Sequence, residues 1–222
     1  MTTSLIRTAV AALAIAVLPS VAQANLPTKS TGLRALDAPA AGKVNVAAFP
    51  KWTGAIGRNW AHGGADQACK RKMGRDCRLN RWQSFLRDAE KLSPQRQLRQ
   101  VNSYVNATSY RSDRAVWGKS DYWAAPGEFF ARGGDCEDYA IAKYMSLKQL
   151  GFDPKKMRVL VLKDTRRGLL HAVLLVEHAG DTLVLDNLSG SVRSWNELTN
   201  YRPLYSVNEA AFWLHPGLKT IS

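Results

Sequence analysis

The spacing of apolar residues predicts helices in the first part of the chain and strands in the later part. Apolar side chains recur every three or four residues over 79–92 and again over 98–105, which predicts two helices joined at Pro94. A third stripe covers 136–150 and is followed by Gly151, a common stop for a helix. We therefore expect a third helix that begins at Cys136.

Three later segments are rich in β-branched and apolar residues, as is typical of buried strands. They cover 157–163, 169–177 and 182–188, and the turn formers Arg167-Gly168 and Ala179-Gly180 separate them. This pattern predicts three antiparallel strands. Helices followed by a sheet indicate an α+β domain rather than a doubly wound sheet.

The remaining segments carry weaker patterns. Residues 106–135 are rich in turn formers and aromatic residues, which predicts a long ordered loop. Residues 25–50 contain much Ala, Pro, Gly and Thr and few large apolar side chains, so we expect a flexible or loosely docked arm there. The folded domain is then expected to cover 51–222.

Residues 1–24 have the pattern of a secretory signal peptide. A positive Arg7 precedes an apolar run over 9–18, and a Pro and the small-residue site Ala22-Gln23-Ala24 follow. The run is too short for a transmembrane helix, although an uncleaved anchor is an alternative. The net charge of +13 would favour nucleic acid or anionic lipid as a partner, but export removes the protein from nucleic acid.

Export also bears on the three cysteines, because an oxidising compartment converts accessible pairs into disulfides. Cys69 and Cys77 are close in a polar segment, so we expect a disulfide between them, with two free thiols as the alternative. Cys136 is left unpaired. It could be a buried apolar residue, an intermolecular partner or a reactive thiol.

The surroundings of Cys136 favour a reactive thiol. A thiol at the start of a helix lies at the positive end of the helix dipole, which favours the thiolate. Gly133 and Gly134 come just before it and allow the backbone to approach closely. His171 in the second predicted strand and Asp186 in the third could supply a base and the group that orients it.

The hairpin register brings these two side chains together. If Ala179-Gly180 is a two-residue turn, Asp186 lies opposite Val173 and diagonal to His171 on the same face, with Cα atoms about 7–8 Å apart. Cys136 would then be the nucleophile of an acyl transfer through a thioester, with His171 as base and acid. The alternative is that each residue is structural: a packed cysteine, a satisfied histidine and an aspartate that begins a turn.

Several motifs together resemble a known family, the bacterial transglutaminase-like cysteine proteinases of the LapG-like periplasmic type. The resemblance covers roughly residues 50–215. The motifs that carry it are Arg81-Trp82, Val101-Asn102 with Asn106, Asp121-Tyr122-Trp123 with Pro126 and Glu128-Phe129, GDCEDYAIAKY over 134–144, HAVLLV from His171, LVLDNL over 183–188, and Arg202-Pro203-Leu204-Tyr205-Ser206 with Asn208.

The resemblance implies a papain-like or transglutaminase-like α+β fold with Cys136, His171 and Asp186 as the catalytic triad. It also implies a Ca²⁺ ion held next to the cysteine by acidic residues. The residues that match are Asp135, Glu137 and Asp138. Three carboxylates in one short segment suit calcium, which takes several oxygen ligands. From the residues alone, N-terminal capping of the helix, which needs no metal, is the preferred explanation, and the resemblance shifts the preference to calcium.

The predicted function is that of a calcium-dependent cysteine endopeptidase of the periplasm. The resemblance implies an exported, adhesin-like protein substrate and an inner-membrane regulator, a cyclic di-GMP receptor of the LapD type. One alternative is a transglutaminase or amidase that acts on a Gln side chain or a cell-wall peptide. Another is a non-catalytic module that binds an anionic polymer or membrane through the basic residues Lys70, Arg71, Lys72, Arg75, Arg78 and Arg81.

Overall fold

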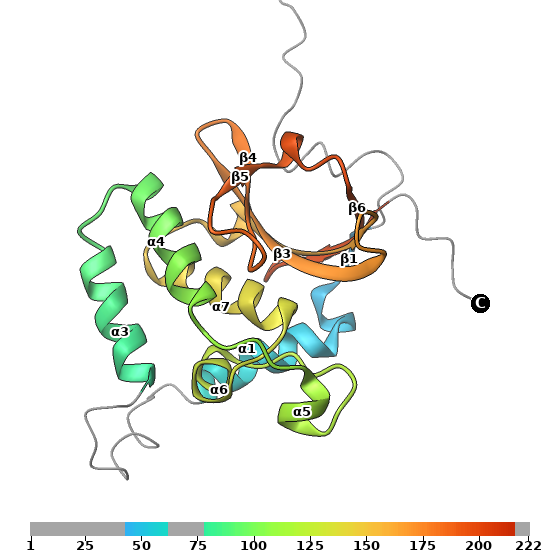
Figure 1. Ribbon diagram of the computed structural model, residues 1–222, viewed down its shortest axis with the longest axis horizontal. Coiled ribbons are helices and arrows are strands. Elements are labelled where there is room, and N and C mark those ends of the chain that lie inside the picture. The colour runs from blue at the N-terminus through green and yellow to red at the C-terminus, as the bar shows by residue number, and fades with distance from the viewer. Residues whose placement is uncertain (1–42, 62–77, 216–222) are drawn as a thin grey trace, which may run out of the picture.

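The computed structural model describes residues 43–61 and 78–215, in which helices precede an antiparallel sheet (Figure 1). The helices are α1 (Pro50–Ala61), α3 (Arg78–Ala89), α4 (Pro94–Asn106), α5 (Asp113–Trp117), α6 (Pro126–Arg132) and α7 (Cys136–Gln149). The strands are β1 (Lys43–Val44), β2 (Met157–Asp164), β3 (Leu169–His178), β4 (Asp181–Leu185), β5 (Arg193–Ser194), β6 (Tyr201–Val207) and β7 (Phe212–Leu214). Short 3-10 turns are η2 (Val46–Ala48), η3 (Pro154–Lys156) and η4 (Trp195–Glu197).

The predicted helices are confirmed. Pro94 is the first residue of α4, where its missing N–H would have no partner within the helix in any case. Helix α7 begins at Cys136, and Gly151 just beyond its end has φ 89°, a value that favours glycine. The structure adds α1, which the periodicity did not predict.

The prediction of one long loop over 106–135 is wrong in part, because the segment contains α5 and α6. Helix α6 begins with Pro126, and the N–H of Ala125 donates to Glu128 Oε2 at 2.8 Å. Phe129 and Phe130 are buried against the neighbouring helices. Helices this short are stabilised by caps and packing, and they contain too few turns to show a clear period.

The sheet has the strand order β1-β7-β6-β2-β3-β4-β5, and every pairing is antiparallel. The three predicted strands lie next to one another as β2, β3 and β4, but β4 ends at Leu185 instead of 188. Ala179 and Gly180 both have positive φ, 51° and 82°, as a tight hairpin turn requires. Leu174 lies opposite Leu185, which is the predicted register.

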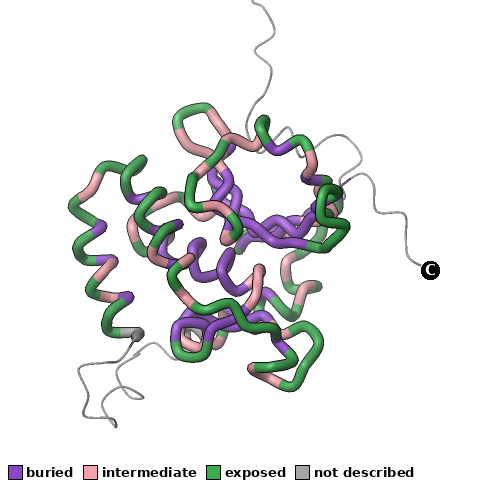
Figure 2. The backbone as a smooth tube through the Cα atoms, in the orientation of Figure 1, coloured by how far each residue is buried: buried purple, intermediate pink, exposed green. Residues whose placement is uncertain are grey.

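The sheet curves, and each of its faces covers a separate part of the core. Side chains such as Leu174 and Val176 of β3 pack toward the helices, with α7 in the centre. The alternate residues Val173 and Leu175 pack with Tyr201 within the curve of the sheet. Figure 2 shows α7 and the central strands as the most continuously buried part of the chain.

The expectation of an arm extending to residue 50 is wrong for residues 43–50. Strand β1 pairs with β7, and the ring of Phe49 contacts the rings of Trp123, Phe212 and Tyr205 at centroid distances of 5.0, 5.0 and 5.6 Å. A single aromatic side chain therefore docks a segment whose composition otherwise resembles a linker. The folded domain includes these residues.

Other expectations concern parts of the chain outside the described residues. These are the signal peptide over 1–24, the arm over 25–42, the Cys69–Cys77 disulfide and most of the basic segment over 70–78. None of the helices in the described part of the chain has the length and apolar character needed to span a bilayer.

Candidate active site

A buried histidine and a buried aspartate form a hydrogen-bonded pair at the end of the β3–β4 hairpin. His171 lies in β3 and Asp186 follows the last residue of β4. His171 Nε2 and Asp186 Oδ1 are 2.9 Å apart, and both side chains are buried. The pairing predicted from the hairpin register is confirmed. Because Nε2 faces Asp186, the other ring nitrogen, Nδ1, is the one left for a nucleophile.

Further donors hold Asp186 in place. Tyr201 donates its hydroxyl to Oδ2 at 2.6 Å, the N–H of Leu188 donates to Oδ1 at 2.8 Å, and Asn106 Nδ2 donates to the backbone oxygen at 2.9 Å. Burial alone would raise the pKa of Asp186. The hydrogen bonds and charge of His171, with the bonds from Tyr201 and Leu188, outweigh burial and keep this pKa below its usual value. The group is therefore a carboxylate at neutral pH.

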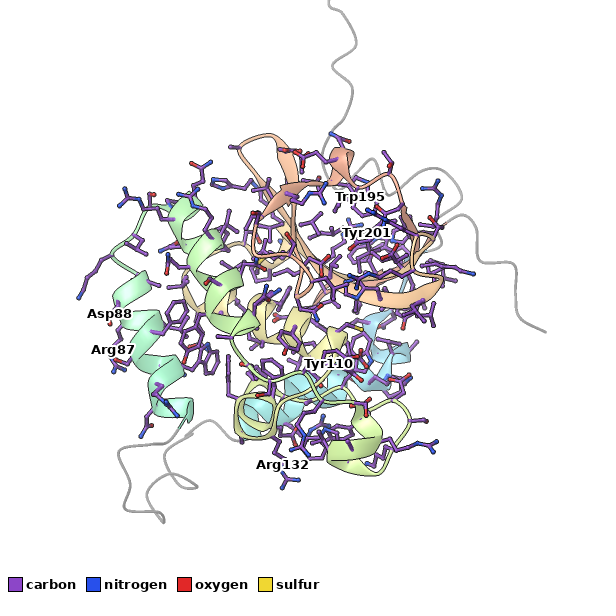
Figure 3. The ribbon with its side chains drawn as sticks, viewed as in Figure 1. Arg87, Asp88, Tyr110, Arg132, Trp195 and Tyr201 are labelled. Carbon is purple, nitrogen blue, oxygen red and sulfur yellow. The ribbon has the colours of Figure 1, made fainter. Side chains whose placement is uncertain are left out.

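Tyr201 is a site residue that sequence reasoning missed. It lies in β6, next to β2 in the sheet, and its ring packs edge-on to His171 with centroids 6.0 Å apart. Figure 3 shows it within the curve of the sheet. A tyrosine at the start of a short strand carries no local signal of such a role, because only the sheet order brings it to Asp186.

Cys136 begins α7 and lies against β3. The backbone N–H of Ala172, the residue that follows His171, lies close enough to the thiol to lower its pKa. The thiol itself donates to Glu137 Oε2, at 3.2 Å. The described residues include no hydrogen bond between the thiol and the imidazole. The structure thus brings Cys136 to the residue beside His171, with the thiol turned toward Glu137.

The expectation that the helix start favours the thiolate is not met in the chain without a metal. Burial raises the pKa of the Cys136 thiol, and the charge and hydrogen bond of Glu137 and the charge of Asp135 raise it further. The N–H of Ala172 acts in the opposite direction but is outweighed. Negative side chains in the first turn oppose the positive end of the helix dipole.

The two glycines before Cys136 are required by close contacts. A Cβ on Gly133 would lie 2.5 Å from the backbone oxygen of Ser109, and Gly133 has φ 82°. A Cβ on Gly134 would lie 2.1 Å from Asp138 Oδ2. Asp138 is fully buried, and its oxygens accept from the N–H groups of Asp135 and Ala124 at 3.1 and 2.7 Å. Gly134 therefore lets the carboxylate of Asp138 fold back and cap the helix, and Gly133 lets the backbone pass close to Ser109.

Five carboxylates gather around the start of α7. Oxygens of Asp135 and Glu137 lie within 4.8 Å of one another and of the Cys136 thiol. Two further sets of three carboxylates, each with oxygens within 4.8 Å of one another, combine residues at the start of α7 with side chains from the α5 region. The members of these two groups are Asp113, Asp135 and Asp138, and Asp113, Asp121 and Glu137. Asp113 and Asp121 are the acidic residues that sequence analysis did not find, since a gap of more than ten residues separates them from α7.

The chemistry of this acidic cluster fits a hard cation. Asp113 Oδ1 and Asp135 Oδ1 are buried and have no hydrogen-bond partner among the described residues. Burial and neighbouring negative charge raise the pKa of Asp113 to about 6 and that of Glu137 to about 9. Unpaired carboxylate oxygens held this close need positive charge, and oxygen donors are what Ca²⁺ prefers. Asp138 contributes less directly, because backbone N–H groups already occupy both of its oxygens.

Lys143 is a second site residue without a sequence signal. It lies in α7, two turns after Cys136, and is fully buried. Its Nζ has no hydrogen-bond partner among the described residues. Burial lowers the pKa of Lys143 to about 7, and the negative charge of Asp186 partly offsets the effect.

Comparison with known proteins places this geometry in a family. The model of the bacterial transglutaminase-like cysteine proteinases matches residues 63–215. The chain belongs to this family. Membership confirms the family resemblance and the α+β cysteine peptidase fold, and it makes the protein a cysteine peptidase. The alternative of a non-catalytic basic module is therefore not supported.

Solved structures of one family member are similar to the chain. Calcium-bound LapG from Legionella pneumophila is 29% identical, with a TM-score of 0.60, and the match covers 67% of this chain and 84% of that one. A second LapG structure is 31% identical, with a TM-score of 0.56 and coverage of 62% and 77%. EGTA-treated LapG is also 31% identical with a TM-score of 0.56, and the match covers 62% of this chain and 75% of that one. Among curated proteins, a sequence search finds no significant match.

Proposed function

We propose that this cysteine peptidase is a calcium-dependent endopeptidase of the periplasm, with Cys136 as nucleophile, His171 as general base and acid, and Asp186 as the residue that orients His171. The observation that carries the proposal is the 2.9 Å hydrogen bond between His171 and Asp186, next to a cysteine that begins a helix. Family membership supports the reaction class.

The geometry supports a two-step hydrolysis. His171 Nδ1 takes the thiol proton as Cys136 Sγ attacks the carbonyl carbon of the peptide, and the imidazolium then donates this proton to the departing amine as the C–N bond breaks. A thioester remains. Water attacks the thioester while His171 accepts its proton, the C–S bond breaks, and the thiol is restored. Asp186, held as a carboxylate, stabilises the imidazolium in both steps.

The backbone N–H of Cys136 is the proposed donor to the developing oxyanion. As the first residue of α7 it has no partner within the helix, and the helix dipole adds positive potential at this point.

Calcium is proposed as the cofactor. Asp113, Asp135 and Glu137 would hold it, with Asp121 beside them and Asp138 as the helix cap that orients Asp135. Lys51 forms an ion pair with Asp121, and the bound ion would supply the further positive charge that the other carboxylates lack. It would in this way offset the charge of Glu137 that opposes the thiolate. The calcium-bound and EGTA-treated forms of LapG support a calcium site in this family.

The compartment and partners follow from the signal peptide pattern and the family. We propose a periplasmic enzyme whose substrate is an exported or cell-surface protein such as a biofilm adhesin. A cyclic di-GMP receptor of the LapD type in the inner membrane is the proposed regulator. A pull-down of the Cys136→Ala variant from a detergent-solubilised cell-envelope fraction, followed by mass spectrometry, would identify both.

Alkylation of the purified protein by iodoacetamide tests the triad directly. In calcium we expect selective labelling of Cys136, slowed at least tenfold in His171→Ala, because the base that removes the thiol proton is gone. Removal of calcium by a chelator should also slow labelling, and Cys136→Ala gives the background. Equal labelling of wild type and His171→Ala would contradict the proposed triad.

A further inference from the structure

Strand β3 has an open edge next to Cys136. Residues 174–178 of β3 pair with β4, whereas in the described part of the chain residues 169–173 have a strand partner only in β2. His178 and Asp181 flank the two-residue turn and form a hydrogen-bonded pair, so the N–H of His178 faces β4. The N–H of Ala172, six residues earlier in β3, lies on the same side and points out of this edge. Backbone groups two residues apart in a strand point to the same side. The N–H and C=O of Leu170 therefore face the open edge as well.

The most exposed large apolar side chains among the described residues lie beside the proposed triad. Leu169 and Leu170, which are 63% and 68% exposed, directly precede His171 in β3. Leu188, 45% exposed, follows Asp186 by two residues, and Tyr110, 62% exposed and labelled in Figure 3, forms a backbone bridge to Gly134. We call these four residues the apolar rim.

This distribution is uneven across the described surface. The other exposed large apolar side chains there are Val44 in β1 and Leu214 in β7, each 39% exposed. Both lie at the far side of the sheet, which β6 and β2 separate from β3. Grouped exposed apolar side chains mark binding surfaces, whereas single ones need no explanation.

We propose that the open edge of β3 and the apolar rim bind the substrate polypeptide in extended form and select apolar side chains two or three residues from the scissile bond. The inference rests on the proposed function and adds the substrate class. An added strand would be held by main-chain hydrogen bonds, which carry no sequence preference, so the rim would supply the selectivity.

The strand geometry sets the positions. A scissile carbonyl at the Cys136 thiol lies beside Ala172, so the substrate residue two positions away lies beside Leu170, and the next one lies beside Leu169. Successive side chains of β3 point to opposite faces, so these two leucines contact the substrate from opposite faces of the added strand.

Cleavage of a peptide pool tests the selectivity. The full mature protein in calcium would be incubated with peptides from a digested bacterial lysate, and the new termini would be located by mass spectrometry. We expect apolar residues to be enriched at the second or third position from the cleaved bond. Leu170→Asn should lower kcat/KM about tenfold for those peptides, chiefly through KM. Leu214→Asn, the same substitution at an exposed leucine of β7, should leave kcat/KM for those peptides unchanged.

Binding provides a second measurement that does not depend on turnover. A fluorescent Ala-rich octapeptide with Leu at both positions two residues from its central bond should bind Cys136→Ala at least tenfold more tightly than the analogue with Asn there. Equal affinity of the two peptides would overturn the inference, as would cleavage sites without apolar enrichment or an equal loss in Leu214→Asn. Iodoacetamide labelling of Cys136 reports on the triad alone, so its failure would count against the proposed function instead.

Discussion

Asp186 and Lys143 are two buried groups of opposite charge in the site, and the charge of Asp186 acts on Lys143. Asp186 has four hydrogen-bond donors around its carboxylate and backbone oxygen, whereas Lys143 Nζ has no partner among the described residues. Asn102 and Asn106, on the helix that packs against α7, each have a buried side-chain oxygen without a partner as well. An isolated buried ammonium is costly in its charged form, which is why its pKa falls.

Lys143→Met tests this interpretation through stability. Methionine keeps an unbranched side chain, one heavy atom shorter, and removes the charge, so we expect a higher urea midpoint than wild type at pH 6. The folded-state pKa of Lys143, about 7, lies below the unfolded value of about 10.4, so the wild type gains stability as the pH rises between these values. The advantage of the variant should therefore shrink at pH 9. A variant less stable than wild type at pH 6 would contradict the expectation.

At the scale of elements, the start of α7 depends on the turn before it. Gly134 gives the space in which Asp138 folds back to cap the helix and orient the first turn, and Cys136 lies in that turn. Capping, the acidic cluster and the nucleophile therefore share one short segment. A change of backbone here should disturb all three together.

Gly134→Ala should destabilise the protein by about 1–3 kcal/mol, because the added methyl group overlaps the Asp138 carboxylate. Urea unfolding measures the loss, and iodoacetamide labelling of Cys136 should slow in parallel. Gly57→Ala is the matched control, since a Cβ at this exposed position of α1 meets nothing within 4 Å and alanine favours a helix. We expect that control to equal or exceed the wild type in stability. Equal stability of the two variants would contradict the steric argument.

At the scale of the whole molecule, a basic chain contains a strongly acidic site. The net charge is +13, yet the side chains around Cys136 are carboxylates contributed by α7 and by the segment that carries α5. A bound cation would join these two parts of the chain. Its effect on stability should therefore depend on whether the carboxylates hold protons.

The difference in Tm between calcium and chelator should be small at pH 5 and larger at pH 8. The pKa values of Asp113, Asp138 and Glu137 are raised to about 6, 8 and 9, so protons compete with the ion at low pH. With chelator, Tm should fall from pH 5 to pH 8, because raised carboxylate pKa values stabilise the fold only while the groups are protonated.

Thermal unfolding followed by circular dichroism measures this difference. Asp113→Asn should reduce the calcium effect at pH 8, and Asp88→Asn, a change at an exposed site in α3, should leave it unchanged. A calcium effect that is the same at both pH values, or that survives in Asp113→Asn, would argue against the proposed ligands.

The features that could be predicted from the sequence are those set by residues close to one another along the chain. The helices over 79–92 and 98–105 show a clear period. The helix that begins at Cys136 is buried on all sides, and the glycine after it marks its end. A two-residue turn dictates the pairing of the hairpin strands. The meeting of His171 and Asp186 could therefore be predicted from residue numbers alone. Helix α6 and strand β1 are too short to show a period. Packing of Phe129 stabilises α6, and pairing with β7 holds β1 in place.

The sequence by itself determined that long helices precede the β2–β4 strands, the register of the β3–β4 hairpin, the helix that begins at Cys136 and the family. These follow from local spacing and motifs. Only the tertiary structure decided which distant residues complete the site: Tyr201 on Asp186, Asp113 and Asp121 beside Glu137, and Phe49 against the aromatic core. It also showed that burial of Cys136 adds to the effect of its sequence neighbours Glu137 and Asp135 and raises the pKa of the thiol. The physical reason is that burial and charge act through space, between groups that the sequence separates by tens of residues.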